Sequence, residues 1–384
     1  MAPARTSLWV QGAVVLALVR VALVVVYVAR QSTTIDGDIN RYFAITHDGV
    51  PYRDQAVEYP PITVGVLEVI GLVARTRTSF GIGLVIVMAL IEMAVCVLMF
   101  RGFGRTVGLT FLYLDTPLYY LLITRVDIIS VALAAAFIVL LVRGRSLSSG
   151  LAWAAAVAAK LWPLPLGVYL VNTALGIRSR ARALVAAAGG LLAIGGAWLA
   201  VGGVDGVRQV LTFRSSQGWH IESIGGNLVR IFMGGQAYDE ANAYRIGRIP
   251  NGLGTALLTV GTLAAIAVCI QAMRQRRLGT GWVTAVLCLL ATATLFSPQY
   301  VIWAIPGAAL AIRESRPWLV VSFAITLALT FVESRFYGKV IDGTAAGNGL
   351  VLVRNLALVV TLAIGAIALW RTGDRKNHGT AALT

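Results

Sequence analysis

The chain has 384 residues, of which 58% are hydrophobic and only 13% are charged. A soluble domain carries about 25% charged residues, so this composition excludes a soluble globule and indicates an all-α polytopic membrane protein, with residues 1–384 forming one integral membrane domain. The net charge of +15 does not indicate nucleic-acid binding, because the basic residues are spread over short loops between apolar runs, where they set membrane topology.

Leu8–Val28 is the first apolar run, interrupted only by Gln11 and Arg20. It is longer than the roughly 7–15 apolar residues of a signal peptide, and no small-residue cleavage site precedes Arg30. We therefore expect it to be a retained first transmembrane helix.

Further apolar runs follow along the whole chain. They are Phe80–Phe100, Val107–Ile123, Ile128–Val142, Leu151–Ala159, Leu161–Leu175, Ala183–Val201, Leu253–Met273, Gly281–Phe296, Tyr300–Ile312, Pro317–Val332 and Gly349–Trp370. Since a spanning helix needs about 20 apolar residues and several runs are shorter, we expect about ten to twelve transmembrane helices, some of them broken. Cys96, Cys269 and Cys288 lie inside these runs without metal-ligand or disulfide spacing, and we expect them to be small buried hydrophobes.

The loops between the runs separate by charge. With a cytoplasmic N-terminus, the cytoplasmic segments are Arg101–Arg105, Arg143–Arg145, Arg178–Arg182, Arg274–Arg277, Arg313–Arg316 and Arg371–Lys376. The other side receives nearly all the acidic residues and the two long loops, residues 31–79 and 202–250. Because short basic loops mark the cytoplasmic side, we expect a multi-pass plasma-membrane protein with both termini cytoplasmic and an extracytoplasmic active site. An enzyme on that face has no sugar nucleotide and must use a lipid-linked donor or hydrolyse its substrate.

The first long loop concentrates acids, aromatic residues and prolines. Asp38–Asp48 carries apolar residues at helical spacing, and Asp36 or Asp38 can cap that helix. Tyr59-Pro60-Pro61 interrupts regular structure, because proline lacks an N–H. Ile62–Val73 then predicts a helix in the membrane interface. The alternative, a short spanning helix, would place every later basic loop outside.

Single charges interrupt the later apolar runs. Arg125 and Asp127 follow Asp115-Thr116-Pro117 at the outer end of a span. Opposite charges at that depth are costly unless they are paired or used, and a structural salt bridge is the alternative. Lys160 lies at the tip of a predicted helical hairpin, where it either extends to the interface or binds a phosphate as a point charge.

Two further polar stretches belong to the outer side. Residues 213–223 include Trp219, His220 and Glu222, a composition that suits a sugar-binding surface and equally the interfacial anchoring of a tryptophan. Ser297–Tyr300 begins a helix with hydroxyl, amide and aromatic groups. The chain has no Walker A, dinucleotide-binding, HExxH or nucleophile-elbow motif, which leaves carboxylate acid–base chemistry, cation binding of an anion and aromatic platforms.

Three motifs follow the first apolar run in a fixed order: Asp38-x-x-x-Tyr42, Gly49-x-Pro51-Tyr52 and Tyr59-Pro60-Pro61. In order and spacing they resemble glycosyltransferase family 87, whose members are GT-C-fold enzymes of actinobacteria that use polyprenyl-phosphate sugars. Arg125-x-Asp127, Lys160 with its following prolines, and Ser297-Pro298 fall where such proteins carry similar elements. The resemblance extends over most of the chain.

The resemblance implies a GT-C-like bundle and an inverting hexosyltransferase, with mannose as the favoured sugar. It assigns Asp38 as the general base that deprotonates the acceptor hydroxyl, with Asp36 as helper or alternative base. The residues expected to bind the donor phosphate are Lys160, Arg125 and His220. The residues expected to contact the substrates are Tyr42, Tyr59, Asp127, Trp219, Glu222, Gln299 and Tyr300. The expected partners are a polyprenyl-phosphate sugar, a glycolipid or cell-envelope glycan acceptor and membrane lipids, without nucleic acid.

Alternatives remain open. Mannose-transferring members often carry histidines soon after the Ser-Pro pair, whereas the residues directly after Ser297-Pro298, Gln299–Trp303, include none, so polyprenyl-phosphate-arabinose stays an alternative donor. A flippase of lipid-linked sugars would use charges near the bilayer midplane, where Glu92 is the one deep acid. A non-catalytic assembly subunit is a further alternative. We expect no cofactor and no resident metal, although Asp36, Asp38 and Glu222 could supply oxygen ligands.

Overall fold

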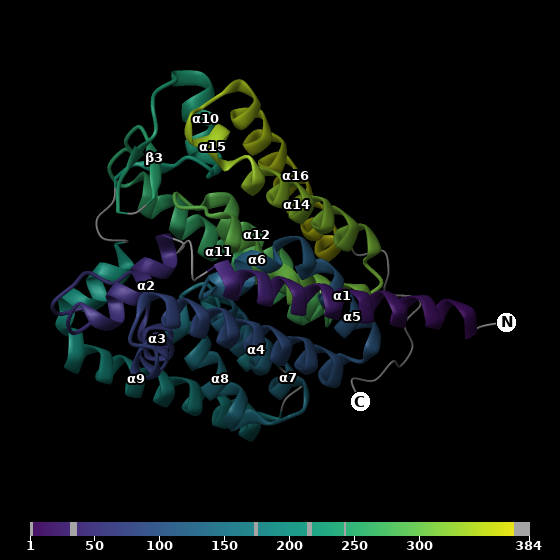
Figure 1. Ribbon diagram of the computed structural model, residues 1–384. Coiled ribbons are helices and arrows are strands. Elements are labelled where there is room, and N and C mark those ends of the chain that lie inside the picture. The colour runs from purple at the N-terminus through teal and green to yellow at the C-terminus, as the bar shows by residue number, and fades with distance from the viewer. Residues whose placement is uncertain (1–2, 31–36, 173–175, 213–216, 242, 372–384) are drawn as a thin grey trace.

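The computed structural model describes residues 3–30, 37–172, 176–212, 217–241 and 243–371 (Figure 1). Nearly all of this is helical. Six described segments are long and apolar enough to cross a membrane: α4 (Arg77–Phe103), Arg105–Thr124, α9 (Ile177–Leu211), α11 (Leu253–Gln275), α14 (Pro317–Arg335) and α16 (Ala345–Trp370). The expected all-α polytopic membrane protein is confirmed.

The remaining bundle helices are one helix of 28 residues and four shorter ones. They are α1 (Pro3–Arg30), α7 (Asp127–Val142), α8 (Ser146–Ala159), α12 (Leu278–Thr292) and α13 (Ile305–Arg313). The span Arg105–Thr124 consists of α5 (Arg105–Asp115), a 3₁₀ turn η1 (Thr116–Leu118) and α6 (Tyr119–Thr124). Pro117 explains the break within this span, because proline lacks a backbone donor.

The expected span Leu161–Leu175 differs most from the structure. After α8 the described residues 161–172 form the 3₁₀ segment η2 (Leu164–Val171) in place of an α-helix. Pro163 and Pro165 open this segment, and its backbone is partly satisfied from neighbouring elements, since the indole of Trp153 donates to the carbonyl of Pro163 at 3.0 Å. Similarly, η4 (Pro298–Ala304) precedes α13, which has Pro306 in its first turn.

The short basic segments gather at one end of the bundle. Arg143 Nη2 donates to the carbonyl of Arg101 at 2.8 Å, and Arg277 Nη1 donates to the carbonyl of Ala368 at 2.5 Å. These contacts bring together the ends of α4, α7 and α16 and the start of α12. Figure 1 shows α1 beginning and α16 ending on the same side of the bundle. We call this side the basic end.

The two long loops lie at the opposite end, here called the polar end. The first contains α2 (Gly37–His47) and α3 (Pro61–Val73), within one residue of the helices expected from sequence. Thr63 near the start of α3 donates to the carbonyl of Ala159 at 2.7 Å, and Gly71 near its end packs on Thr46 of α2. Both neighbours belong to the polar end, so α3 does not cross the bundle.

The second long loop adds a small antiparallel sheet that the sequence did not predict. Its strands are β1 (Trp219–His220), β2 (Tyr238–Asp239) and β3 (Tyr244–Ile246), in the order β1-β3-β2. Helix α10 (Ile224–Met233) begins at Ser223, whose hydroxyl accepts from the backbone N–H of Gly226 at 3.0 Å. This layer packs on α15 (Tyr337–Ile341) and the first turns of α16.

A group of charged side chains lies inside the bundle between the two ends. Arg20 of α1 pairs with Asp115 of α5, and its Nε lies 3.7 Å from a carboxylate oxygen of Glu92 on α4. All three side chains are buried. Glu92 is therefore one member of a mutually paired group that joins three helices, as the cost of isolated charge in a membrane requires.

Candidate active site

Asp38 and Arg125 form an accessible ion pair at the polar end. Asp38 lies in the first turn of α2, and Arg125 occupies the extended residue between α6 and α7. Their nearest oxygen and nitrogen are 2.7 Å apart, with 43% of the Asp38 side chain and 15% of the Arg125 side chain exposed. A carboxylate in the first turn of a helix is favoured by the helix dipole, yet this one keeps an open face.

Asp127 and Lys160 form a second pair beside the first. Lys160 is the C-cap of α8, and its Nζ lies 2.5 Å from Oδ1 of Asp127, which starts α7. The indole N–H of Trp303 donates to the same oxygen at 2.7 Å. With 17% of its side chain exposed, Lys160 remains within reach of a ligand. We call Asp38, Arg125, Asp127 and Lys160 the Asp38 cluster.

Aromatic rings form a rigid wall along this cluster. The ammonium of Lys160 lies 4.4 Å from the ring centre of Tyr300 and 4.9 Å from that of Trp303. The rings of Tyr300 and Trp303 stack with centres 4.4 Å apart, and Trp162 stacks on the other face of the group at 5.6 Å from Trp303. The indole of Trp162 donates to Ser130 at 2.8 Å. Such pairs hold cations and ring substrates in fixed orientations.

Two tyrosines lie on the first-loop side of the cluster. Tyr42 of α2 and Tyr59 meet edge to face, with ring centres 5.7 Å apart. Burial raises the pKa of Tyr42 well above its usual value, and the negative charge of Asp38 adds to the effect. The Tyr42 hydroxyl therefore stays protonated near Asp38.

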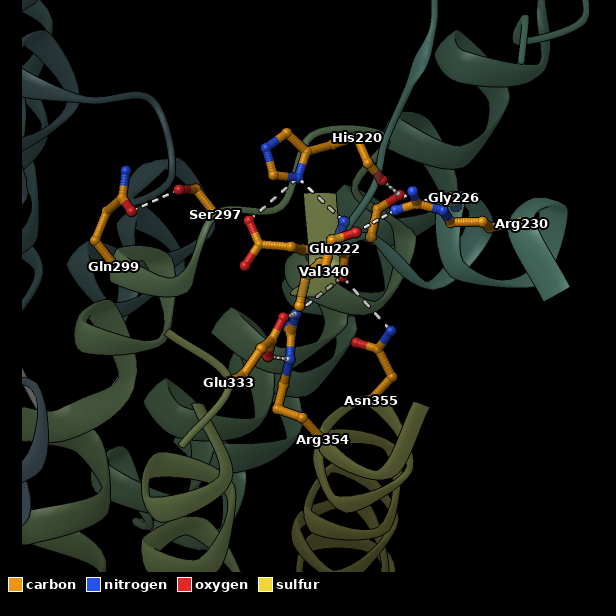
Figure 2. A network of polar contacts seen from close by, with 11 residues as sticks. His220, Glu222, Gly226, Arg230, Ser297, Gln299, Glu333, Val340, Arg354 and Asn355 are labelled. Atoms are coloured by element: carbon orange, nitrogen blue, oxygen red, sulfur yellow. Dashed lines mark hydrogen bonds and ion pairs between the residues drawn. The ribbon is translucent and has the colours of Figure 1, made fainter. Parts of the chain in front are cut away.

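A second group of charges at the same end is closed to solvent (Figure 2). Arg354 of α16 pairs with Glu333 of α14 through two contacts, at 2.7 Å and 3.0 Å, and neither side chain is exposed. Arg354 also donates to the backbone carbonyl of Glu222 at 3.0 Å. We call His220, Glu222, Glu333 and Arg354 the Glu333 cluster.

The protonation states in this cluster follow from burial. Burial and the positive charges of Arg245 and Arg354 lower the pKa of His220 to about 3, so the ring is neutral. Burial and the neighbouring carboxylate of Glu333 raise the pKa of Glu222. His220 Nδ1 lies 3.7 Å from a carboxyl oxygen of Glu222 and accepts from its backbone N–H at 3.4 Å, which leaves the ring proton on Nε2.

The two clusters are neighbours. The backbone N–H of His220 donates to the carbonyl of Thr294 at 3.0 Å, just before the stretch that carries Tyr300 and Trp303. Figure 2 shows Ser297 and Gln299 beside His220, and the Ser297 hydroxyl donates to the Gln299 side chain at 2.5 Å. The Glu333 cluster thus fixes the second loop against the residues that line the Asp38 cluster.

The structure brings together many of the candidate residues and separates others. The residues at or beside the Asp38 cluster are Asp38, Tyr42, Tyr59, Arg125, Asp127, Lys160 and Tyr300. His220 and Glu222 lie in the Glu333 cluster, Gln299 accepts from the Ser297 hydroxyl, and Trp219 packs in the core of the second loop. Asp36 lies outside the described residues.

Sequence reasoning missed Glu333 and Arg354. A charge next to or within an apolar run is the signal that could have indicated them, since intramembrane charges require partners. Within the described ranges, no three His, Cys, Asp or Glu side chains come together as a metal site. Asp38 and Glu222, considered above as oxygen ligands, belong to different clusters.

Comparison with models of protein families identifies the family of this chain. The model of glycosyltransferase family 87 matches residues 58–298, more than half of the chain. A search of curated proteins finds no match. The matched stretch contains Arg125, Asp127 and Lys160, whereas Asp38 precedes it, so the place of Asp38 in the site rests on its contact with Arg125.

Proposed function

This chain belongs to glycosyltransferase family 87, and from that premise we propose which sugar it transfers, from which donor and on which face of the membrane. The enzyme takes mannose from a polyprenyl-phosphate and moves it to a glycolipid or cell-envelope glycan outside the plasma membrane. The observation that carries this proposal is the Asp38 cluster, in which an accessible carboxylate, Asp38, pairs with the partly exposed cation of Arg125. A second partly exposed cation, Lys160, lies in the same cluster and pairs with Asp127.

The orientation is supported by the distribution of charge. The basic segments gather at one end of the bundle and the Asp38 cluster at the other. Because short basic loops face the cytoplasm, the polar end is extracytoplasmic. No sugar nucleotide is present there, and a lipid-linked sugar phosphate supplies both the activated sugar and an anion that suits Lys160 and Arg125.

Asp38 is the general base of the transfer. Its carboxylate accepts the proton of the acceptor hydroxyl as that oxygen attacks the anomeric carbon. The bond between this carbon and the phosphate oxygen breaks, and the electron pair leaves with the polyprenyl phosphate. Attack opposite the leaving group inverts the anomeric configuration. Asp36 has the role of orienting Asp38.

Lys160 and Arg125 stabilise the leaving phosphate. Lys160 is held by Asp127 and by the faces of Tyr300 and Trp303, so its ammonium needs little reorganisation as negative charge develops. Arg125 contacts Asp38 directly and links the base to the leaving-group side of the site. His220 is neutral and buried, and it acts in this proposal through the position of the second loop rather than through charge.

Product analysis tests the proposal. The purified protein in liposomes is incubated with polyprenyl-phosphate-mannose or polyprenyl-phosphate-arabinose and candidate glycolipid acceptors, and products are identified by mass spectrometry. We expect a mannosylated acceptor of inverted configuration, formed about 10²–10⁴-fold more slowly by the Asp38→Asn variant. An arabinosylated product would show that the donor sugar is arabinose and not mannose. Full transfer by Asp38→Asn would refute the assignment of the base, and lipid-linked sugar translocation without transfer would favour the flippase.

A further inference from the structure

A groove of about 450 Å³ runs between α15 and the first turns of α16, on the surface of the bundle. The residues that line it are Phe336, Lys339, Ala346, Gly349, Leu350 and Val353. The four residues from α16 follow helical spacing and therefore form one face of this helix. The groove is thus a continuous strip along a spanning helix, with a lysine at its outer end.

Small residues keep the groove open. Position 349 is a glycine, and no atom lies within 4 Å of the place where its Cβ would stand. The other face of α15 is packed against the second loop. Val340 is buried there, and the ring centres of Tyr337 and Tyr244 are 6.2 Å apart. Within the part of the chain that the structure describes, the groove side of α15 has no such partner.

Lys339 brings an uncompensated positive charge to this strip. Among the described residues it forms no ion pair, and its ammonium lies 5.2 Å from the ring centre of Phe336. Asp342, the acid closest in sequence, interacts electrostatically with Arg230 of α10. A cation above an apolar strip is complementary to a molecule with an anionic head and a hydrocarbon tail.

The residues around the groove are those expected at the membrane interface, where a molecule with an anionic head and a hydrocarbon tail is found. Val353 at the end of the groove and Leu356 beyond it are half-exposed on the outside of the bundle, as expected for side chains that face lipid tails. Beside it, Arg230 of α10 donates to the carbonyl of Ile341 at 2.6 Å, and α10 exposes 80% of Phe232 and 81% of Met233. A helix with that apolar face lies in the membrane interface.

We propose that this groove binds an anionic phospholipid of the outer leaflet. The phosphate lies at Lys339, and one acyl chain follows Gly349, Leu350 and Val353. Lys339 has no contact with the Asp38 cluster among the described residues, so this lipid is separate from the substrates of the transfer reaction. The lipid fills the surface between α15 and α16 and supports the second loop, which packs on the other face of α15.

Lipid retention by the purified protein tests the proposal. Phosphatidylglycerol and phosphatidylcholine with identical acyl chains are titrated in turn, and bound lipid is counted by native mass spectrometry. We expect one phosphatidylglycerol to bind more tightly than phosphatidylcholine. In Lys339→Gln this preference falls by about five-fold, as expected for one basic residue at a membrane surface. In Gly349→Leu the added side chain occupies the groove, and this bound lipid is lost.

Two matched variants control for general effects. Arg248→Gln removes an exposed cation of the second loop, and Gly195→Leu adds the same side chain at a position of α9 that also has no atom within 4 Å. Both should retain the lipid as the unmodified protein does. Unchanged phosphatidylglycerol preference in Lys339→Gln, or unchanged retention in Gly349→Leu, overturns the proposal. The proposal is also overturned if these two variants change the KM for a transfer substrate but retain phospholipid as before. That result would place a substrate lipid in the groove.

Discussion

The Asp38 cluster and the Glu333 cluster contain the same kinds of residue and lie at the same end of the bundle, yet they differ in access to solvent. Asp38 keeps 43% of its side chain exposed, and Arg125 and Lys160 keep 15% and 17%. Glu333 and Arg354 expose nothing. The first group can exchange its partners for a substrate, whereas the second is fully committed to contacts within the protein.

This difference separates a chemical role from a structural one. An exposed ion pair contributes little to stability because water competes for both partners. A buried ion pair leaves a desolvated charge when one member is removed. We therefore expect substitutions in the Asp38 cluster to affect transfer, and substitutions in the Glu333 cluster to affect stability first.

Arg354→Met should produce the largest loss of stability. It leaves Glu333 and Glu222 without their shared cation in a site closed to water, which costs about 3–5 kcal/mol in the free energy of unfolding. Unfolding in mixed micelles measures this. The double variant with Glu333→Met should recover most of the loss, because it removes the stranded charge. A loss below about 1 kcal/mol for Arg354→Met would contradict the structural role.

Lys160→Gln should reduce kcat by about 10²–10³-fold, as expected for removal of one electrostatic contact to a developing anion. Steady-state transfer assays with the lipid-linked donor measure this change. Arg53→Gln is the matched control, since Arg53 is an exposed cation of the first loop outside the cluster. If both variants lose the same activity, Lys160 acts through general surface charge and not through the leaving phosphate.

We expect His220 to make the free energy of unfolding depend on pH, with an effect of intermediate size. Its folded pKa of about 3 lies below the unfolded value of about 6.5, so the unfolded chain binds an extra proton between these values. The stability from His220 is present above pH 6.5 and is lost as the pH falls, by about 2 kcal/mol at pH 5.

The stability of the unmodified protein is measured against pH beside that of His220→Asn. This variant keeps a nitrogen or oxygen near the position of Nδ1 but does not titrate. Glu222 has a raised pKa, and its contribution is lost as the pH rises; since it is present in both proteins, it cancels in the comparison. Parallel stability profiles for the two proteins between pH 7 and pH 5 would show that His220 titrates normally.

Asp38→Asn should have the smallest effect on stability. Because the carboxylate is exposed and its pair with Arg125 competes with water, the change in unfolding free energy should be below about 1 kcal/mol. Thermal unfolding in detergent measures it. A cost as large as that of Arg354→Met would show that Asp38 supports the fold, and the distinction between the two clusters would fail.

The sequence predicted local features well and distant pairings poorly. Helices α2 and α3 start and end within one residue of expectation, because spacing and proline are local signals. The sequence also indicated Arg125, Asp127 and Lys160 individually as candidate site residues. That Lys160 pairs with Asp127 could not be read from the sequence, because the contact joins residues 33 positions apart on different helices.

The Glu333 cluster shows the same limit more strongly. Arg354 and Glu333 lie on separate spanning helices, 21 positions apart in the sequence, and no local pattern relates one to the other. His220 was expected to carry charge to a phosphate, but burial beside Arg245 and Arg354 makes it neutral. Strands of two or three residues are too short to leave a periodic pattern, so the small sheet was missed.

One measurement tests the distinction most directly: the transfer rate and the melting temperature of Asp38→Asn and Glu333→Gln, determined side by side with the lipid-linked donor. We predict that Asp38→Asn keeps the melting temperature and loses about 10²–10⁴-fold in rate, the range for a general base. We predict that Glu333→Gln lowers the melting temperature and retains transfer once folded at low temperature. Normal transfer by Asp38→Asn, together with inactivity of a stably folded Glu333→Gln, would contradict the account.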